Sequence, residues 1–115
     1  QTQLRIDLYR RLSMASSERE LDALLAEAKD RFGALPDPVK FCFYAERIRV
    51  LAEAAGALGV EAQGERLKVL LPAPNGGEYA RIGGHFPILT KRRAVAKLQE
   101  IEKFLKYTLP SIRKQ

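Results

Sequence analysis

The sequence has 115 residues, of which 46% are hydrophobic, a composition typical of a folded globular protein. No stretch approaches the ~18 consecutive apolar residues of a membrane span, and the first residues lack the basic start and apolar core of a signal peptide. One cysteine, Cys42, excludes an internal disulfide and favours a reducing, cytoplasmic environment. Because the first residue is Gln and not Met, we expect a piece of a longer chain.

The formal net charge of +6 is concentrated near the carboxyl-terminal end. Residues 1–90 hold 12 basic and 12 acidic residues, whereas residues 91–115 hold 8 basic and 2 acidic ones. A basic tail can attract nucleic acid or an acidic protein surface. A solvated helix face explains the same pattern without a partner, so both interpretations stay open.

The amino-terminal part of the chain predicts two helices separated by a serine-rich break. Leu4, Leu8 and Leu12 recur at helical spacing and form one apolar stripe. Ser17 and Glu20 have the spacing of a capping box, in which the Ser17 hydroxyl accepts from the Glu20 N–H and the Glu20 carboxylate reaches back to the Ser17 N–H. A second apolar stripe follows this box.

A glycine and two prolines predict the turn into a third helix. Gly33 suits the position after a helix end, where a left-handed residue costs least. Asp37 can cap the next helix, with Pro38 at its first position. We expect this helix to span about Pro38 to Leu58 and to end at Gly59. Its wide apolar arc indicates burial on more than one flank.

The hydrophobic pattern then changes to short runs separated by turn residues. Gly64-Glu65 predicts one hairpin and Gly83-Gly84 a second, with a loop over residues 72–77 between them. We expect a last helix to start at Arg93 and to end at Pro110. The chain is therefore expected to be a single α+β domain over residues 1–115, with about three helices, a small antiparallel sheet and a carboxyl-terminal helix. The runs expected as strands are Val60–Gln63, Leu67–Leu71, Tyr79–Ile82 and Phe86–Leu89.

The inventory of reactive side chains argues against catalysis or a metal site. With one histidine, His85, and one cysteine, Cys42, no zinc site of the Cys/His type can form without borrowed ligands. We expect Cys42 to act as a small core hydrophobe and His85 as a solvated turn residue. The glycine pairs lack the spacing of a phosphate-binding loop, and capping or ion pairing explains Asp30 and Asp37. No cofactor is expected in this chain.

Three distinctive strings lie within residues 9–61. Tyr9-Arg10-Arg11-Leu12 precedes a serine-bearing break, and Arg47-Ile48-Arg49 lies on the third helix before Leu58-Gly59-Val60. Between them lies a string whose members are Asp30, Arg31, Phe32, Gly33, Leu35, Pro36, Asp37 and Pro38. In these strings the chain resembles the C-terminal domain of the bacterial transcription-repair coupling factor, an ATP-driven DNA translocase. The central string is interpreted as a structural motif that marks the fold.

The resemblance implies a regulatory role in transcription-coupled nucleotide excision repair. In this family the domain is held against the amino-terminal region of the same protein, which is similar to a component of the excinuclease. There it covers the surface that recruits the damage-recognition protein of the excinuclease. The whole factor acts on RNA polymerase stalled at a DNA lesion. The ATP and Mg sites belong to its other domains, so the resemblance implies no activity for this chain alone.

We hypothesise that exposed basic residues without enough acidic neighbours contribute to that closed interface. The candidates are Arg47, Arg49, Lys91, Arg92 and Arg93. The alternative is a nucleic-acid-binding module that uses the basic carboxyl-terminal helix, because phosphate contacts need such charges. The dispersed tyrosines give that alternative no visible stacking surface.

Overall fold

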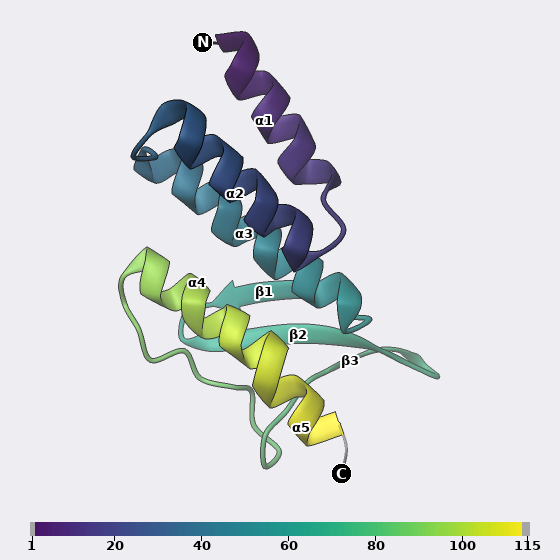
Figure 1. The fold of residues 1–115 in the computed structure, drawn as a ribbon. Coiled ribbons are helices and arrows are strands. Elements are labelled where there is room, and N and C mark those ends of the chain that lie inside the picture. Colours follow the sequence, from purple (N-terminus) through teal and green to yellow (C-terminus); the bar gives the residue numbers. More distant parts are fainter. Residues whose placement is uncertain (1, 114–115) are drawn as a thin grey trace. The chain divides into compact units, whose positions relative to one another are not determined.

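The computed structural model describes residues 2–113 and divides them into two compact units, up to Val50 and from Leu51 onward. The first unit holds α1 (Thr2–Met14), α2 (Glu18–Phe32) and most of α3 (Asp37–Ala54), as Figure 1 shows. The second holds β1 (Gly59–Gln63), β2 (Arg66–Ala73), β3 (Gly76–Tyr79) and a helical segment made of α4 (Ala94–Lys103), η1 (Phe104–Thr108) and α5 (Leu109–Arg113). The predicted α+β class is confirmed. That the two units act as one domain stays a prediction.

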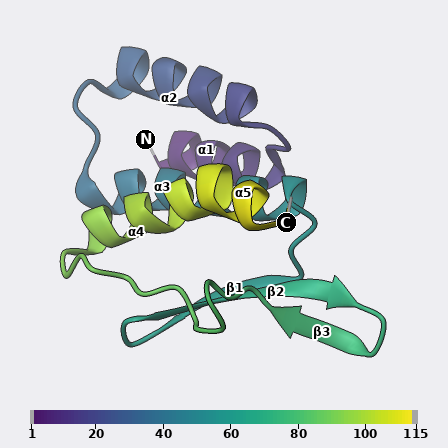
Figure 2. The ribbon, with the colours of Figure 1, turned by 90° about the horizontal axis from the view of Figure 1, so that it is seen from below.

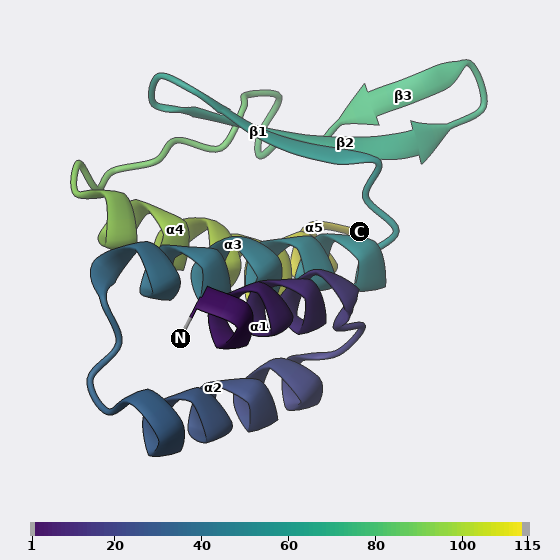
Figure 3. The ribbon, with the colours of Figure 1, turned by 90° about the horizontal axis from the view of Figure 1, so that it is seen from above.

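The core of the first unit is built from the apolar stripes of its three helices. Figure 3 shows α1 running alongside α2 and α3. Leu12 and Leu21 are almost completely buried, at 1% and 0% exposure. Such packing stabilises short helices that would be marginal alone. The buried members of this core are Leu8, Leu12, Ala15, Leu21, Leu24, Ala28, Leu35, Val39, Phe43 and Val50.

The start of α2 confirms one half of the predicted capping box and corrects the other. The Glu20 N–H donates to the Ser17 hydroxyl at 3.1 Å, as expected. The Glu20 carboxylate, however, accepts from the backbone N–H and the hydroxyl of Ser16, at 3.2 and 2.9 Å, and not from the Ser17 N–H. The carboxylate thus stabilises the residue before the cap, where it also meets the positive end of the helix dipole.

The third helix begins and ends earlier than its sequence pattern predicts. It starts at Asp37, and the carbonyl of Pro36 accepts from the N–H groups of Val39 and Lys40 at 3.0 and 3.1 Å. Pro38 is therefore its second residue. The predicted end at Gly59 is wrong, because the helix ends at Ala54 and Gly59 is the first residue of β1.

Gly56 is the residue that terminates α3. Its φ of +74° is in the left-handed region. The Gly56 N–H donates to the Glu53 carbonyl at 3.0 Å, and the Ala57 N–H donates to the Ala52 carbonyl at 2.9 Å. This pair of bonds is a Schellman motif with glycine in the position that favours it.

The sheet has the order β1-β2-β3 and is antiparallel throughout. The predicted hairpin at Gly64-Glu65 is confirmed, with Gln63 opposite Arg66. A positive φ at Gly64 and none at Glu65 is the pattern of a type II′ turn. The expected loop over residues 72–77 is wrong, because β2 and β3 extend into it and only Pro74 and Asn75 form the turn.

The second predicted hairpin is reduced to a tight turn. Ile82 and His85 exchange both backbone hydrogen bonds around Gly83-Gly84, at 2.8 and 3.0 Å, but neither predicted strand forms around them. The chain then returns beside the start of β2, where the Leu67 N–H donates to the Pro87 carbonyl at 2.9 Å. Pro87 cannot donate to a ladder, which is consistent with its place outside the strands.

The last helix continues past the proline that was expected to end it. Figure 2 shows this helical segment running along one face of the sheet. Pro110 lies inside α5, and the preceding η1 is a π-helical turn in which the Leu109 N–H donates to the carbonyl of Phe104, five residues earlier. Pro110 has no N–H to donate, so the helix continues past it without one hydrogen bond to the preceding turn. Within the predicted polar tail, Lys114 and Gln115 lie outside the described residues.

Candidate protein-interaction surfaces

The predicted structural motif forms the end of α2, the start of α3 and the turn between them. Gly33 has a φ of +72°, and its N–H donates to the Lys29 carbonyl at 2.8 Å. Leu35 is buried and Phe32 packs against the core of the first unit. The remaining members are exposed: Asp30, Arg31, Gly33, Pro36, Asp37 and Pro38. Phe32 and Leu35 therefore pack with the core of the first unit, whereas Pro36 and Pro38 lie at the surface.

Arg47 joins two helices of the first unit through ion pairs. Its guanidinium lies 3.2 Å from the Glu18 carboxylate and 2.6 Å from that of Asp22, so it joins α3 to the start of α2. The Arg47 side chain is only 14% exposed. The premise that it is an exposed cation without local acids is wrong.

Arg49 is held in the same unit by backbone carbonyls. Its Nη2 donates to the carbonyl oxygens of Leu12 and Ala15, at 3.2 and 2.8 Å, and its Nε donates to Glu46 at 2.6 Å. Leu12 is in the last turn of α1, whose carbonyls have no partner within the helix. Arg49 thus caps α1, and the premise of an unpaired surface charge is wrong for it as well.

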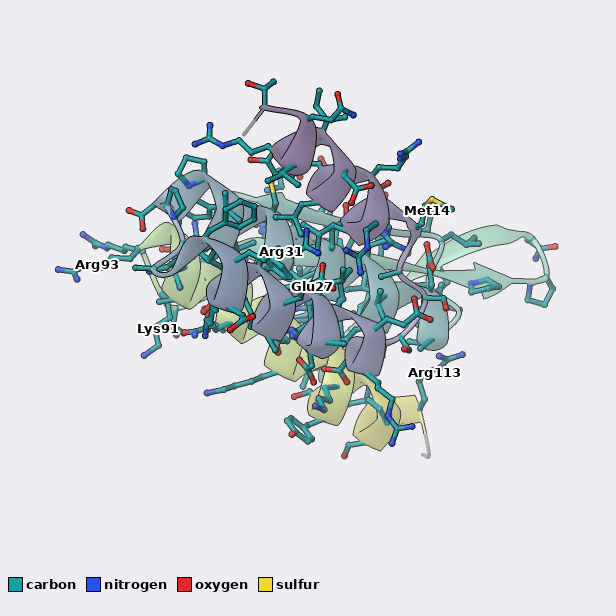
Figure 4. All side chains as sticks on the ribbon, turned by 45° about the horizontal axis from the view of Figure 1, so that its top comes forward. Met14, Glu27, Arg31, Lys91, Arg93 and Arg113 are labelled. Carbon is teal, nitrogen blue, oxygen red and sulfur yellow. The ribbon has the colours of Figure 1, made fainter. Side chains whose placement is uncertain are left out.

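Arg11 and Glu27 form an exposed ion pair between α1 and α2. The hydrogen bond from Arg11 lowers the pKa of Glu27 despite some desolvation, and the charge of Arg31 contributes in the same direction. Figure 4 shows Glu27 and Arg31 together on α2. The charge of Arg31, a member of the structural motif, thus helps to lower the pKa of Glu27.

Lys91, Arg92 and Arg93, which we call the basic segment, are all exposed and lie directly before α4. Figure 4 shows the side chains of Lys91 and Arg93 extending away from the ribbon. The charge expected at this position is therefore accessible to a partner. Of the five candidate interface residues, these three are the exposed ones, although Lys91 has Glu100 as an acidic neighbour.

Glu100 fixes the backbone at the start of the basic segment. Its carboxylate accepts from the N–H of Thr90 at 2.8 Å, from the Thr90 hydroxyl at 2.8 Å and from the N–H of Lys91 at 3.1 Å. Desolvation by burial raises the pKa of Glu100, but these hydrogen bonds and the charge of Lys91 outweigh it, so the pKa is lowered. The ionised carboxylate therefore stabilises the loop.

A second basic surface, which sequence reasoning missed, lies on the sheet. Tyr79 and Phe86 meet edge to face with ring centroids 5.8 Å apart. The Lys68 ammonium lies 5.4 Å from the Phe86 centroid, and the Arg81 guanidinium 4.3 Å from it. The sequence does show that Arg66 and Lys68 alternate with the apolar Leu67, a pattern that places both cations on one face of a strand. The rings could not be paired from sequence because their contact depends on the turn at Gly83-Gly84.

The reactive residues have the surroundings that were expected of them. Cys42 is half-buried against the core of the first unit, and His85 is exposed in its turn. Across residues 2–113, no group of three His, Cys, Asp or Glu side chains is placed to hold a metal ion. None of the helices described has the length and apolar character needed to cross a membrane.

Comparison with known proteins identifies relatives over the first part of the chain. A family model described as "TRCF domain" matches residues 1–82. The transcription-repair-coupling factor of Mycobacterium tuberculosis is 44% identical over 59 residues, which cover 51% of this chain and 5% of that protein. The factors of Haemophilus influenzae and Escherichia coli are each 37% identical, over 59 and 57 residues.

The aligned segment is a small part of these relatives, at 5% of the length of each. No solved structure matches this chain. The family model nevertheless covers well over half of the sequence, and it includes the whole structural motif as well as Arg47 and Arg49. The chain therefore belongs to the TRCF domain family.

Proposed function

We propose that this chain is a non-catalytic, autoinhibitory interaction domain of a transcription-repair coupling factor. The observation that carries the proposal is the family match over residues 1–82. In the proposed closed state, the domain binds the amino-terminal, excinuclease-like region of the same protein. It thereby covers the surface that recruits the damage-recognition protein of the excinuclease until the factor engages stalled RNA polymerase. ATP hydrolysis and translocation on DNA belong to other parts of that factor.

The basic segment is the proposed contact for this docking. Its three cations are exposed, and Glu100 holds the backbone that presents them. A fixed loop loses less conformational entropy on binding than a mobile one. Arg47 and Arg49 contribute indirectly in this proposal, because they hold the first unit together.

Tethering explains how a modest interface keeps the domain closed. A domain joined to its partner by the chain experiences a high effective concentration of it. Reversal of such an equilibrium from about 1:99 to about 99:1 requires roughly 5.5 kcal/mol of differential affinity. Engagement of RNA polymerase or DNA elsewhere on the factor would supply that free energy.

The test is a binding titration of this chain against the amino-terminal region of a coupling factor, with the damage-recognition protein as competitor. We expect saturable binding that this competitor displaces. We also expect the triple variant Lys91→Glu, Arg92→Glu, Arg93→Glu to bind at least about tenfold more weakly. The matched control is Arg19→Glu, Lys29→Glu, Lys40→Glu, which makes the same charge change at exposed positions of the first unit.

Two results would overturn the proposal. One is the absence of binding to the amino-terminal region at any salt concentration. The other is simultaneous binding of the domain and the damage-recognition protein, because masking requires the two to compete. If a single-stranded oligonucleotide instead binds with a steep dependence on salt that the Lys91–Arg93 variant removes, the chain is a nucleic-acid-binding module.

A further inference from the structure

The face of the sheet that carries Arg66 and Lys68 differs in character from the opposite face. Side chains of β2 alternate between the two faces. Leu67 and Val69 point to the buried face, with 1% and 0% exposure, whereas Arg66 is exposed and Lys68 is half-buried. We call Arg66, Lys68, Tyr79, Arg81 and Phe86 the basic sheet face.

The aromatic pair holds two of these cations in place. The Lys68 ammonium lies 5.5 Å from the Tyr79 centroid and 5.4 Å from that of Phe86, so it contacts both rings. The Arg81 guanidinium lies 4.3 Å from the Phe86 centroid and also donates to the Gly84 carbonyl at 3.4 Å. Cations within about 6 Å of a ring are attracted to its face. Their positions are therefore largely fixed before any ligand arrives, which lowers the entropic cost of binding.

Within the described part of the chain, no carboxylate neutralises these charges. Arg66, Lys68 and Arg81 form no ion pair within residues 2–113. Glu61 is the register partner of Lys68 on β1, but the two do not pair. Three cations without an ion-paired carboxylate, two of them held against aromatic rings, favour an anionic ligand.

Apolar side chains next to these cations indicate which kind of anionic ligand this face would bind. Arg66, Arg81, Phe86 and Ile88 line a shallow groove of about 290 Å³, together with His85. Ile88 is 56% exposed. An acidic polypeptide can bury its own apolar side chains against such a residue while its carboxylates meet the cations. A single-stranded nucleic acid would gain affinity by stacking its bases on ring faces, and cations already lie over the Phe86 ring.

We propose that the basic sheet face binds an extended acidic polypeptide segment that presents both carboxylates and aliphatic side chains on one side. This inference goes beyond the docking proposed above, because it concerns other residues and does not require the amino-terminal region as the partner. Ile88 is the bridge partner of Arg66, so the cations and Ile88 lie on the same face of the sheet. In an extended segment every second side chain points to the same side, so a carboxylate and an aliphatic side chain two residues apart can both meet this face.

The experiment uses this chain and three labelled probes. The first is a short peptide of repeated Glu-Glu-Leu-Leu, which presents Glu and Leu in turn on each side when extended. The second has Ser in place of each Glu, and the third is a single-stranded oligonucleotide. Binding is measured by fluorescence anisotropy for the natural chain, for Arg66→Gln, Lys68→Gln, Arg81→Gln, and for the control Arg19→Gln, Lys29→Gln, Lys40→Gln. Both variants lose the same charge, so a general electrostatic effect would be equal in the two.

We expect saturable binding of the Glu–Leu peptide that is about tenfold weaker in the sheet-face variant and within about twofold of the natural chain in the control. The Ser peptide and the oligonucleotide should bind at least about tenfold more weakly than the Glu–Leu peptide. Thermal unfolding of each variant is measured first. If the triple variant is unfolded, Arg66→Gln replaces it, because Arg66 stacks on neither ring, and Arg19→Gln is then the control.

Absence of saturable binding by the Glu–Leu peptide would overturn this inference, as would equal affinity in the two variants. Tighter binding of the oligonucleotide than of the peptide would overturn it in favour of a nucleic-acid surface. None of these results bears on docking to the amino-terminal region, which is measured with a different partner.

Discussion

The carboxylate of Glu100 accepts hydrogen bonds from both the backbone N–H and the hydroxyl of Thr90, ten residues earlier in the chain. The same carboxylate accepts a third hydrogen bond from the Lys91 N–H, at the start of the basic segment. An acidic side chain thus holds in position the loop that presents three cations. In a chain with a net charge of +6, one of the two acidic residues beyond position 90 has this role.

Replacement of Glu100 by Gln should destabilise the protein at neutral pH. Glutamine keeps one acceptor but lacks the charge that strengthens all three hydrogen bonds, so we expect a loss of about 1 kcal/mol. Because the folded state lowers the pKa of Glu100 below its ordinary value of 4.5, its stabilisation is fully present above 4.5. It is lost as the pH falls through the lower, folded-state pKa. Urea denaturation across this range measures the effect.

The difference between the natural chain and Glu100→Gln should therefore shrink at acidic pH. The same substitution at Glu78, an exposed residue of β3, serves as the control and should change stability little. A Glu100→Gln variant whose deficit is the same at neutral and at acidic pH would show that the charge of the carboxylate does not stabilise the loop.

Replacement of Arg49 by Ala should remove the cap of α1. The carbonyls of Leu12 and Ala15 would lose a charged donor, and we expect a loss of about 2 kcal/mol in the free energy of unfolding. Arg49→Lys should restore only part of this, since an ammonium cannot reproduce the geometry of the guanidinium. Lys40→Ala, at an exposed position of the same helix, is the control. Equal stability of Arg49→Ala and Lys40→Ala would contradict a capping role.

The amino-terminal half of the fold was predictable because its signals are local. The leucine stripes, the Ser17 cap and the turn between α2 and α3 each depend on residues within one or two helical turns. The acidic partners of Arg47 and the carbonyl partners of Arg49 were not predictable, since they lie 25 to 37 residues away in the chain. Glu46, three residues before Arg49, was the one partner that the helical spacing indicated.

The second half of the fold was less predictable because its pairing is not local. The first hairpin was correct, since its turn is two residues long and begins with glycine. The segment after β3 folds back only at the tight turn between Ile82 and His85, and then pairs with the start of β2 through Ile88 and Arg66. This pairing brings together the aromatic pair and its cations, which explains why the basic sheet face was missed.

Pro110 should be a source of local instability in the last helix. It is exposed and lies within α5, where it offers no N–H to the preceding turn. We expect Pro110→Ala to raise the free energy of unfolding by about 1 kcal/mol, after allowance for the greater freedom of the unfolded chain. Ser111→Ala is the neighbouring control. A clear loss of stability on replacement of Pro110 would show instead that the π-helical turn depends on the ring.

The end of α3 gives a prediction that distinguishes a helix end at Gly56, as the structure has it, from one at Gly59, as the sequence pattern predicts. Gly56 has a φ of +74° and an open environment, so an added Cβ meets no atom but strains the backbone. We expect Gly56→Ala to cost about 1 kcal/mol, because a left-handed conformation disfavours any residue with a side chain. Gly59 has no positive φ and also has an open environment.

Gly59→Ala should therefore be nearly neutral, since alanine loses less conformational freedom than glycine when it enters a strand. Urea denaturation of the two variants, side by side, gives the order of their stabilities. If Gly59 terminated the helix, as the pattern of apolar residues suggested, Gly59→Ala would be the more damaging change. The order thus tests the Schellman motif at Gly56 directly, with each glycine as the control for the other.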